Sequence, residues 1–208
     1  PIDREILLVA HEQDYVDRCL SGSLNPKEVR RIGLEPWTDA FVPRTMRIIG
    51  GAVEALAHVT RFGGMAANLA GGTHHSHRSF GSGYCVFNDL AICALLARDE
   101  YGYERIAVLD LDVHQGDGTA TILEGEESFV HVHIHMHYWQ VISIFFSVRW
   151  TVTSFLDRPQ GVSPSIFTGR TSGHTHAYTH VTCASTRAPA HTQPVFHVYI
   201  YVYTLLYN

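Results

Sequence analysis

The chain has 208 residues, 46% of them hydrophobic, and a formal net charge of −5 at pH 7. Its apolar runs are too short to span a membrane, and the acidic balance argues against a general nucleic-acid-binding protein. The four cysteines show neither a Cys-x-x-Cys spacing nor a regular rhythm, which is typical of reduced thiols inside a cell. No signal peptide is visible, so we expect a cytoplasmic or nuclear location and not secretion; the start at Pro1 predicts a missing beginning.

The charge balance changes abruptly near residue 130. Residues 1–130 carry 11 Lys and Arg against 19 Asp and Glu, a balance of −8. Residues 131–208 carry four arginines and one acid, a balance of +3, together with nine of the fifteen histidines. Because one folded domain rarely changes composition so sharply, the sequence predicts a domain over 1–130 and a distinct tail over 131–208.

Apolar periodicity predicts alternating helices and strands in the first 130 residues. Helices are expected over 3–20, over 44–61 with an end at Gly63-Gly64, from Asn88 or Asp89 to near Gly102, and as a short element to about Glu124. Strands are expected over 67–70 and 105–114. This order is typical of an α/β fold in which a parallel sheet is covered by helices.

The second of these strands ends in a polar cluster. Ile106 to Leu109 form a continuous apolar stretch, as expected of a strand covered on both faces, and the acids follow at its carboxyl end. In open α/β sheets that end is where ligands bind. Asp112 and His114 are two residues apart and therefore point to the same side of an extended chain. A carboxylate and an imidazole at this spacing supply half of a zinc site.

The tail alternates histidine with apolar or small residues, as in 131–137, 173–180 and 197–203. Strict alternation can indicate strands, which would make the tail a genuine but diverged β-rich half. Translated CA/TG repeats give the same letters, so we favour translated non-coding sequence from a frameshift or a retained intron. A metal-binding histidine tract is a third interpretation, disfavoured because the histidines are dispersed. On the favoured interpretation, most of 136–208 is expected to be irregular and poorly ordered.

Three ordered blocks resemble the zinc-dependent histone deacetylase superfamily, in particular its short class IV and bacterial single-domain branch. They are Asn-Leu-Ala-Gly-Gly-Thr-His-His at 68–75, Gly-Tyr-Cys-Val-Phe-Asn-Asp at 83–89 and Asp-Leu-Asp-Val-His-Gln-Gly-Asp-Gly at 110–118. The resemblance runs from about residue 3 to about residue 128. It implies an arginase/deacetylase-like three-layer α/β fold, here truncated to a partial domain.

The resemblance also implies roles for these residues. Asp112 and His114 correspond to zinc ligands, and the tandem His74 and His75 face the zinc-bound water. The carboxylates of Asp110 and Asp117 hold the ring nitrogens of the two histidines, which fixes their tautomers. Gly83 and Tyr84 correspond to the wall of the tunnel that takes the acyl-lysine stem.

In the family's mechanism the histidine at the position of His75 is the general base, while His74 with Asp110 stabilises charge. The resemblance brings zinc as cofactor, a possible structural monovalent cation near Asp110, and an acetylated protein or small acetylated amine as substrate, with no direct contact to nucleic acid or membrane. His11 and His58 are expected to be structural or solvent-facing, and His77 is expected to face solvent.

The family's second half finds no match in the tail. A third zinc ligand is expected in an Asp-x-Leu-x-x-Asp segment, and the tail has only Asp157. A catalytic tyrosine is expected in a Gly-Gly-Tyr turn, and the tail has no Gly-Gly. The resemblance implies a zinc hydrolase that removes acetyl or acyl groups from lysine side chains of histones or other proteins. Because one ligand and the tyrosine find no match, the 208-residue chain as written is expected to be inactive or a very poor enzyme. The alternatives are an inactive fragment and an acetylpolyamine deacetylase.

Overall fold

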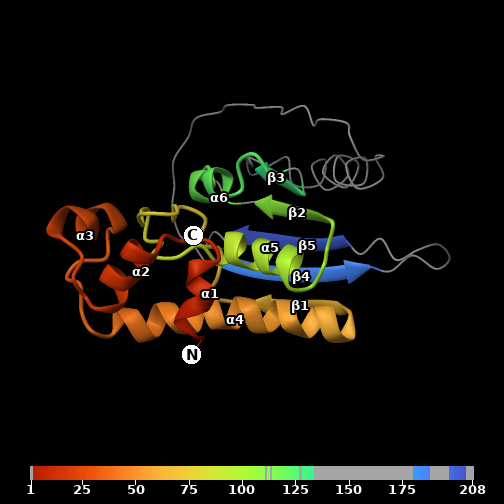
Figure 1. Cartoon of the computed structure of the whole chain (residues 1–208), viewed down its shortest axis with the longest axis horizontal. Coiled ribbons are helices and arrows are strands. Elements are labelled where there is room, and N and C mark those ends of the chain that lie inside the picture. The colour runs from red at the N-terminus through yellow and green to blue at the C-terminus, as the bar shows by residue number, and fades with distance from the viewer. Residues whose placement is uncertain are drawn as a thin grey trace.

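The computed structural model of the chain describes residues 2–110, 112, 114–126 and 128–133, together with two strands at 180–187 and 197–204. The elements of these residues form one five-stranded sheet with helices packed beside it (Figure 1). Within this part of the chain, no helix combines the length and the apolar character that crossing a membrane requires.

Three short helices open the chain: α1 (Arg4–Leu8), α2 (Gln13–Leu20) and α3 (Pro26–Ile32). The single helix predicted over 3–20 is therefore broken in two. The break lies at Glu12, whose backbone is extended and whose N–H donates to the carbonyl of Arg78 at 2.9 Å. A contact with a loop distant in sequence thus replaces the helical hydrogen bond at this residue.

The long helix α4 (Phe41–Phe62) runs beside the edge strand β1 (Gly64–Asn68) (Figure 1). The helix ends at Gly63, which adopts a positive φ of 71°, a conformation open to glycine. The strand lies earlier than the predicted 67–70. Asn68 at its end donates to the carbonyl of Ile48 at 2.8 Å, which ties the strand to the helix before it.

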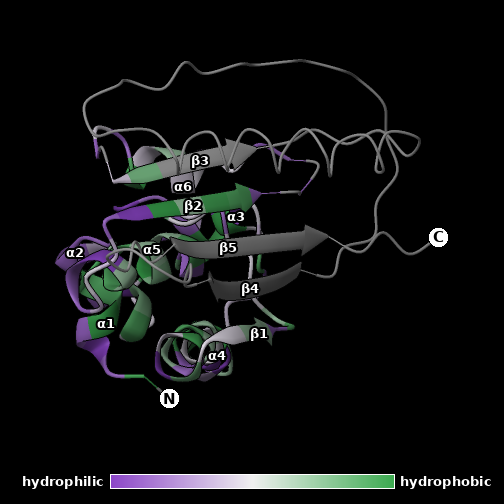
Figure 2. Ribbon diagram, turned by 90° about the vertical axis from the view of Figure 1, so that its right-hand side faces the viewer, coloured by the Kyte–Doolittle hydropathy of each residue, from purple (hydrophilic) through white to green (hydrophobic). Residues whose placement is uncertain are grey.

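The central part of the fold is apolar and buried. Helix α5 (Asp89–Asp99) is capped by Asn88, whose side chain accepts from the N–H of Ala91, and it packs against α4 and β2. Strand β2 (Arg105–Asp110) is buried from Ile106 onwards, as predicted from its apolar run. Figure 2 shows this strand and α5 as predominantly hydrophobic. Helix α6 (Asp117–Ile122) and strand β3 (Phe129–His133) follow.

The sheet has the order β1-β4-β5-β2-β3 and includes two strands of the tail, β4 (His180–Arg187) and β5 (His197–Thr204). Strand β2 pairs in parallel with both β3 and β5, as the predicted parallel sheet requires. Strand β4, however, is antiparallel to β1 and β5, so the sheet is mixed. Strands joined by a short connection, as β4 and β5 are, can pair antiparallel without a crossover helix.

Irregular structure was expected for most of 136–208, and β4 and β5 depart from that expectation. The remaining residues of 136–208 lie outside the described residues, so for them the expectation stays a prediction. Alternation over 197–203 does correspond to a strand, because successive side chains of a strand face opposite sides of the sheet. The origin of 131–208, a diverged half or translated non-coding sequence, stays open. The three-layer arrangement, with helices on both faces of the sheet, stays a prediction.

His11 is a buried structural residue at the break between α1 and α2. Its exposed fraction is 4%, its Nδ1 donates to the carbonyl of His77 at 2.9 Å, and its Nε2 accepts from the N–H of Asn88 at 2.9 Å. The ring packs against Tyr15 and Phe87. Both nitrogens are engaged in the neutral form, and burial lowers the pKa of His11 to about 4.

We expect this histidine to make stability fall with acid. The folded pKa of about 4 lies below the ordinary 6.5, so the unfolded chain binds the extra proton between these values. His11's contribution is full above pH 6.5 and is lost as pH falls to 4, a loss of about 3 kcal/mol. Urea unfolding across this window should show a shallower pH slope for His11→Gln than for the wild type. Equal slopes would contradict the prediction.

Candidate active site

The loop between β1 and α5 carries the tandem histidines. The first residue of α5 binds the part of this loop that lies immediately before them. The carboxylate of Asp89, fully buried, accepts from the N–H of Gly72 at 2.8 Å and from the N–H and hydroxyl of Thr73 at 2.7 and 2.8 Å. Sequence analysis assigned Asp89 only to a helix start. The structure gives it a second task, because these hydrogen bonds fix the backbone immediately before His74.

Asn88 and α6 hold the part of the same loop that contains the two histidines. The Asn88 amide donates to the carbonyl of Ser76 at 2.9 Å and to the hydroxyl of Thr119 at 3.1 Å. The N–H of Thr119 in turn donates to the carbonyl of His74 at 3.0 Å. The backbone of the two histidines is therefore held at the start of α5 on one side and by α6 on the other.

Gly118 lets α6 approach this loop closely, and we expect Gly118→Ala to be strongly destabilising. A Cβ there would lie 2.4 Å from the carbonyl oxygen of Ser76 and 2.7 Å from that of His74, both backbone atoms. Overpacking of this kind costs about 3 kcal/mol. Gly102→Ala is the comparison, since it meets open space and only a positive φ, a strain of about 1 kcal/mol. Chemical denaturation of both variants measures the difference; equal losses would contradict the packing argument.

The first histidine–carboxylate pair is buried at the end of β2. Nδ1 of His74 lies 2.6 Å from Oδ2 of Asp110, and the other oxygen of Asp110 accepts from the N–H of Asp112 at 3.0 Å. Burial disfavours charge on His74, but the hydrogen bond and negative charge of Asp110, with the charge of Asp112, outweigh it and raise the pKa of His74. This pair therefore favours a protonated imidazole.

The second pair is more open and has the opposite electrostatic character. Nδ1 of His75 lies 2.9 Å from Oδ1 of Asp117, and the His74 and His75 ring centroids are 4.1 Å apart. Burial and the neighbouring charge of His74 lower the pKa of His75, despite Asp117. Two adjacent imidazoles whose pKa values are pushed apart can take separate acid and base roles. His75 is the one kept neutral.

Asp112 and His114 lie beside these pairs. Oδ1 of the buried Asp112 is 2.9 Å from Nδ1 of His114 and 3.8 Å from Nε2 of His74. The His75 and His114 ring centroids are 5.8 Å apart. The structure thus brings together the six residues that the sequence singled out: His74, His75, Asp110, Asp112, His114 and Asp117.

The donor chemistry of Asp112 and His114 fits part of a zinc site, since a carboxylate oxygen and an imidazole nitrogen are both ordinary zinc ligands. Among the described residues, no group of three or more His, Cys, Asp or Glu side chains could hold a metal ion. The expected monovalent cation near Asp110 stays a prediction without support from these contacts.

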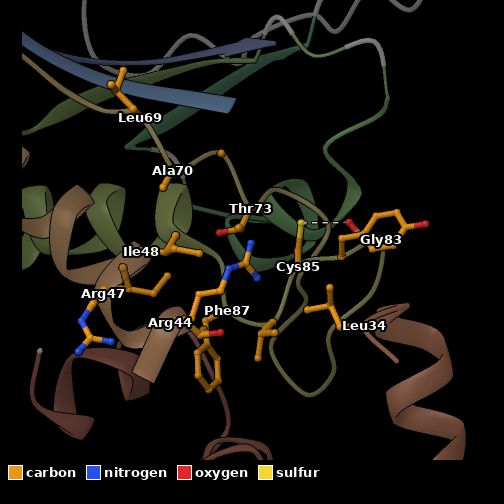
Figure 3. A pocket seen from close by; sticks show the side chains of 16 residues that line it. Leu34, Arg44, Arg47, Ile48, Leu69, Ala70, Thr73, Gly83, Cys85 and Phe87 are labelled. Atoms are coloured by element: carbon orange, nitrogen blue, oxygen red, sulfur yellow. Dashed lines mark hydrogen bonds between the residues drawn. The ribbon is translucent and has the colours of Figure 1, made fainter. Parts of the chain in front are cut away.

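A cavity of about 660 Å³ adjoins the loop (Figure 3). Gly83, Tyr84, Cys85 and Arg44 are among the residues that line it, and Figure 3 shows Gly83 and Cys85 on one side and Arg44 and Arg47 on the other. A Cβ at Gly83 would lie 2.6 Å from His75, so only glycine allows this approach. Tyr84 is 72% exposed and has a positive φ of 64°, held by its N–H donating to the carbonyl of Ile32. Of the two predicted tunnel residues, Gly83 therefore lies beside His75, whereas the ring of Tyr84 lies next to Gly33.

His77 is a site residue that sequence analysis placed in solvent. Its side chain is only 16% exposed and its Nε2 lies 3.5 Å from Oδ2 of Asp117. The signal in the sequence is its spacing, two residues after His75, although that spacing alone does not show which carboxylate it meets. His58, by contrast, lies exposed on α4, as expected.

Comparisons with known proteins cover the part of the chain that carries these residues. The family model for the histone deacetylase domain matches residues 1–145. An uncharacterized protein of Picosynechococcus is 46% identical over 124 residues, which cover 60% of this chain and 41% of that protein. The acetoin utilization protein AcuC of Staphylococcus aureus is 33% identical over 126 residues (56% and 32%), and the rat polyamine deacetylase HDAC10 is 31% identical over 134 residues (61% and 23%). The matched part of the chain spans less than half of each relative.

Proposed function

The chain belongs to the histone deacetylase family, and on this premise we propose that its site hydrolyses the amide of acetylated amines with the help of a zinc ion. The observation that carries the proposal is the pair of histidine–carboxylate dyads beside Asp112 and His114. A structural histidine needs one such partner at most. Two dyads side by side with divergent pKa shifts are typical of acid–base machinery.

His75 is the general base in this proposal. Its Nδ1 faces Asp117, so Nε2 is the ring atom that can take a proton from the attacking water and later deliver it to the leaving amine. Asp117 orients the ring and stabilises the charge that forms on it. His74, whose pKa is raised beside Asp110, supplies positive charge near the reacting carbonyl.

Asp112 and His114 would hold the zinc ion, which when bound polarises the acetyl carbonyl and makes its water more acidic. Gly83, next to the base, and Tyr84, in the lining of the adjoining cavity, would bound the path of the acyl-bearing side chain. The substrate class we propose first is acetyl-lysine in histones or other proteins. An acetylated polyamine is the second candidate, favoured by the similarity to the rat polyamine deacetylase.

Metal binding and hydrolysis by the purified 208-residue chain test this proposal. We expect weak zinc binding that is lost in Asp112→Ala, and slow hydrolysis that a chelator removes. The reason is that the described residues supply two zinc donors, Asp112 and His114, whereas a catalytic zinc site ordinarily has three protein ligands. An acetyl-lysine peptide and an acetylated polyamine, assayed in parallel, separate the two substrate classes. Zinc bound at Asp112 without any hydrolysis would favour the non-catalytic alternative. Fast hydrolysis would mean that residues outside the described part complete the site.

A further inference from the structure

His77 lies in a defined packing site next to the second dyad. Its ring stacks on Phe80, with centroids 4.3 Å apart and planes at 22°, and the guanidinium of Arg31 lies 4.6 Å from the centroid of the same Phe80 ring. His77 Nδ1 lies 2.8 Å from the hydroxyl of Thr121. The ring is therefore held on one face and at one nitrogen, and its other nitrogen faces Asp117.

Thr121 fixes the orientation of the His77 ring. The Thr121 hydroxyl oxygen lies 2.8 Å from Nδ1 of His77 and 3.0 Å from the carbonyl oxygen of Gly118. With Nδ1 held there, the other ring nitrogen, Nε2, lies 3.5 Å from Oδ2 of Asp117. Burial raises the pKa of Asp117, but the hydrogen bond and attraction of His75, together with the attraction of His77, lower it overall.

The two oxygens of Asp117 are divided between the two histidines. Oδ1 accepts from the N–H of Gly118 at 3.0 Å and faces Nδ1 of His75 at 2.9 Å, whereas Oδ2 faces His77. The Asp117 side chain is 48% exposed, so packing restrains it little. Rotation about its terminal torsion is soft, and it would move Oδ1 away from His75.

We propose that His77 is a positioning residue that holds the Asp117 carboxylate in the orientation required by His75. The catalytic consequence rests on the proposed function, whereas the orientation itself does not. His77 acts only through Asp117 and His75, so it differs from the residues that would touch substrate or metal.

Three variants separate orientation from packing. His77→Phe keeps a ring to stack on Phe80 and removes both nitrogens. His77→Gln places an amide N–H near the position of Nε2 and should rescue the contact. Thr121→Val removes the partner of Nδ1 without changing the ring, and it serves as a milder second test should His77→Phe fold poorly. His58→Phe is the matched control, a histidine of α4 packed on Phe62 and remote from the site.

The first readout requires no activity. In the full chain with ¹⁵N-labelled histidine, the Nδ1–H signal of His75, assigned by its loss in His75→Gln, reports the hydrogen bond to Asp117. We expect His77→Phe to broaden this signal and speed its exchange with water, Thr121→Val to do so less, and His77→Gln and His58→Phe to leave it intact. An unchanged signal in a folded His77→Phe would overturn the proposal.

The second readout is the hydrolysis of an acetyl-lysine peptide. We expect kcat to fall about ten-fold in His77→Phe with KM changed less than about two-fold, at the low end of the 10–100-fold loss typical of outer orienting partners. His77→Gln should recover most of it. A change in KM with kcat unchanged in His77→Phe would contradict the positioning role. So would a loss of kcat in His77→Gln as large as the loss in His77→Phe. Absence of hydrolysis in the wild type would count against the proposed function, while the His75 signal would still decide on His77.

Discussion

Replacement of His75 by alanine is expected to reduce amide hydrolysis by about 10²–10⁴-fold, the range typical of a lost general base. The reason lies in the site's electrostatics: the pKa of His75 is lowered while that of His74 is raised, so His75 is the imidazole available to accept a proton. The ring is only one-fifth exposed and is held by Asp117, which makes its orientation specific.

Single-turnover assays with the protein in excess measure this loss even when wild-type hydrolysis is slow. His58→Ala on the exposed face of α4 is the control, and it should keep the wild-type rate. Zinc binding should change little, because His75 is not one of the two proposed donors. Retention of more than about a tenth of the wild-type rate in His75→Ala would show that another group takes the proton.

Replacement of Asp89 by alanine is expected to lower the free energy of unfolding by about 4 kcal/mol. The change removes a fully buried carboxylate and leaves the N–H of Gly72 and both donors of Thr73 without their acceptor. Each unsatisfied buried donor costs about 1–3 kcal/mol. The loop before His74 would lose its fixed conformation together with this stability.

Urea unfolding compares Asp89→Ala with Asp99→Ala at the other end of α5. Asp99 is an exposed partner of Arg98, and such surface pairs are worth about 0–1 kcal/mol. Asp89→Asn keeps one acceptor oxygen and should fall between the two. A loss below about 1 kcal/mol in Asp89→Ala would mean that water or the relaxed loop satisfies these donors.

Local sequence patterns determined a large part of this fold. The apolar run from Ile106 to Leu109 predicted a buried strand, and the polar residues after it predicted a site at its carboxyl end. Asn88 was expected at the start of a helix and caps α5. These features depend on periodicity, capping and chain direction, which residues close in sequence specify by themselves.

The motif blocks determined the family and the six residues that meet at the site, and the domain match supports that family. Their pairing requires that the β1–α5 loop lies next to the segment between the end of β2 and the start of α6. The break of the first helix at Glu12 was not predictable, because the N–H that leaves the helix binds a carbonyl at Arg78. Similarly, the alternation over 197–203 left a strand open as one interpretation, and the pairing of β5 with β2 and β4 belongs to the tertiary structure.

Only the tertiary structure decided how the site is held. Asp89 meets Thr73 across 16 positions, Asn88 meets Thr119 across 31, and His77 meets Thr121 across 44. The close approach of Gly118 to the carbonyls of His74 and Ser76 likewise joins segments distant in sequence. No local pattern encodes these contacts, because each depends on where two separately formed elements are placed by the core between them.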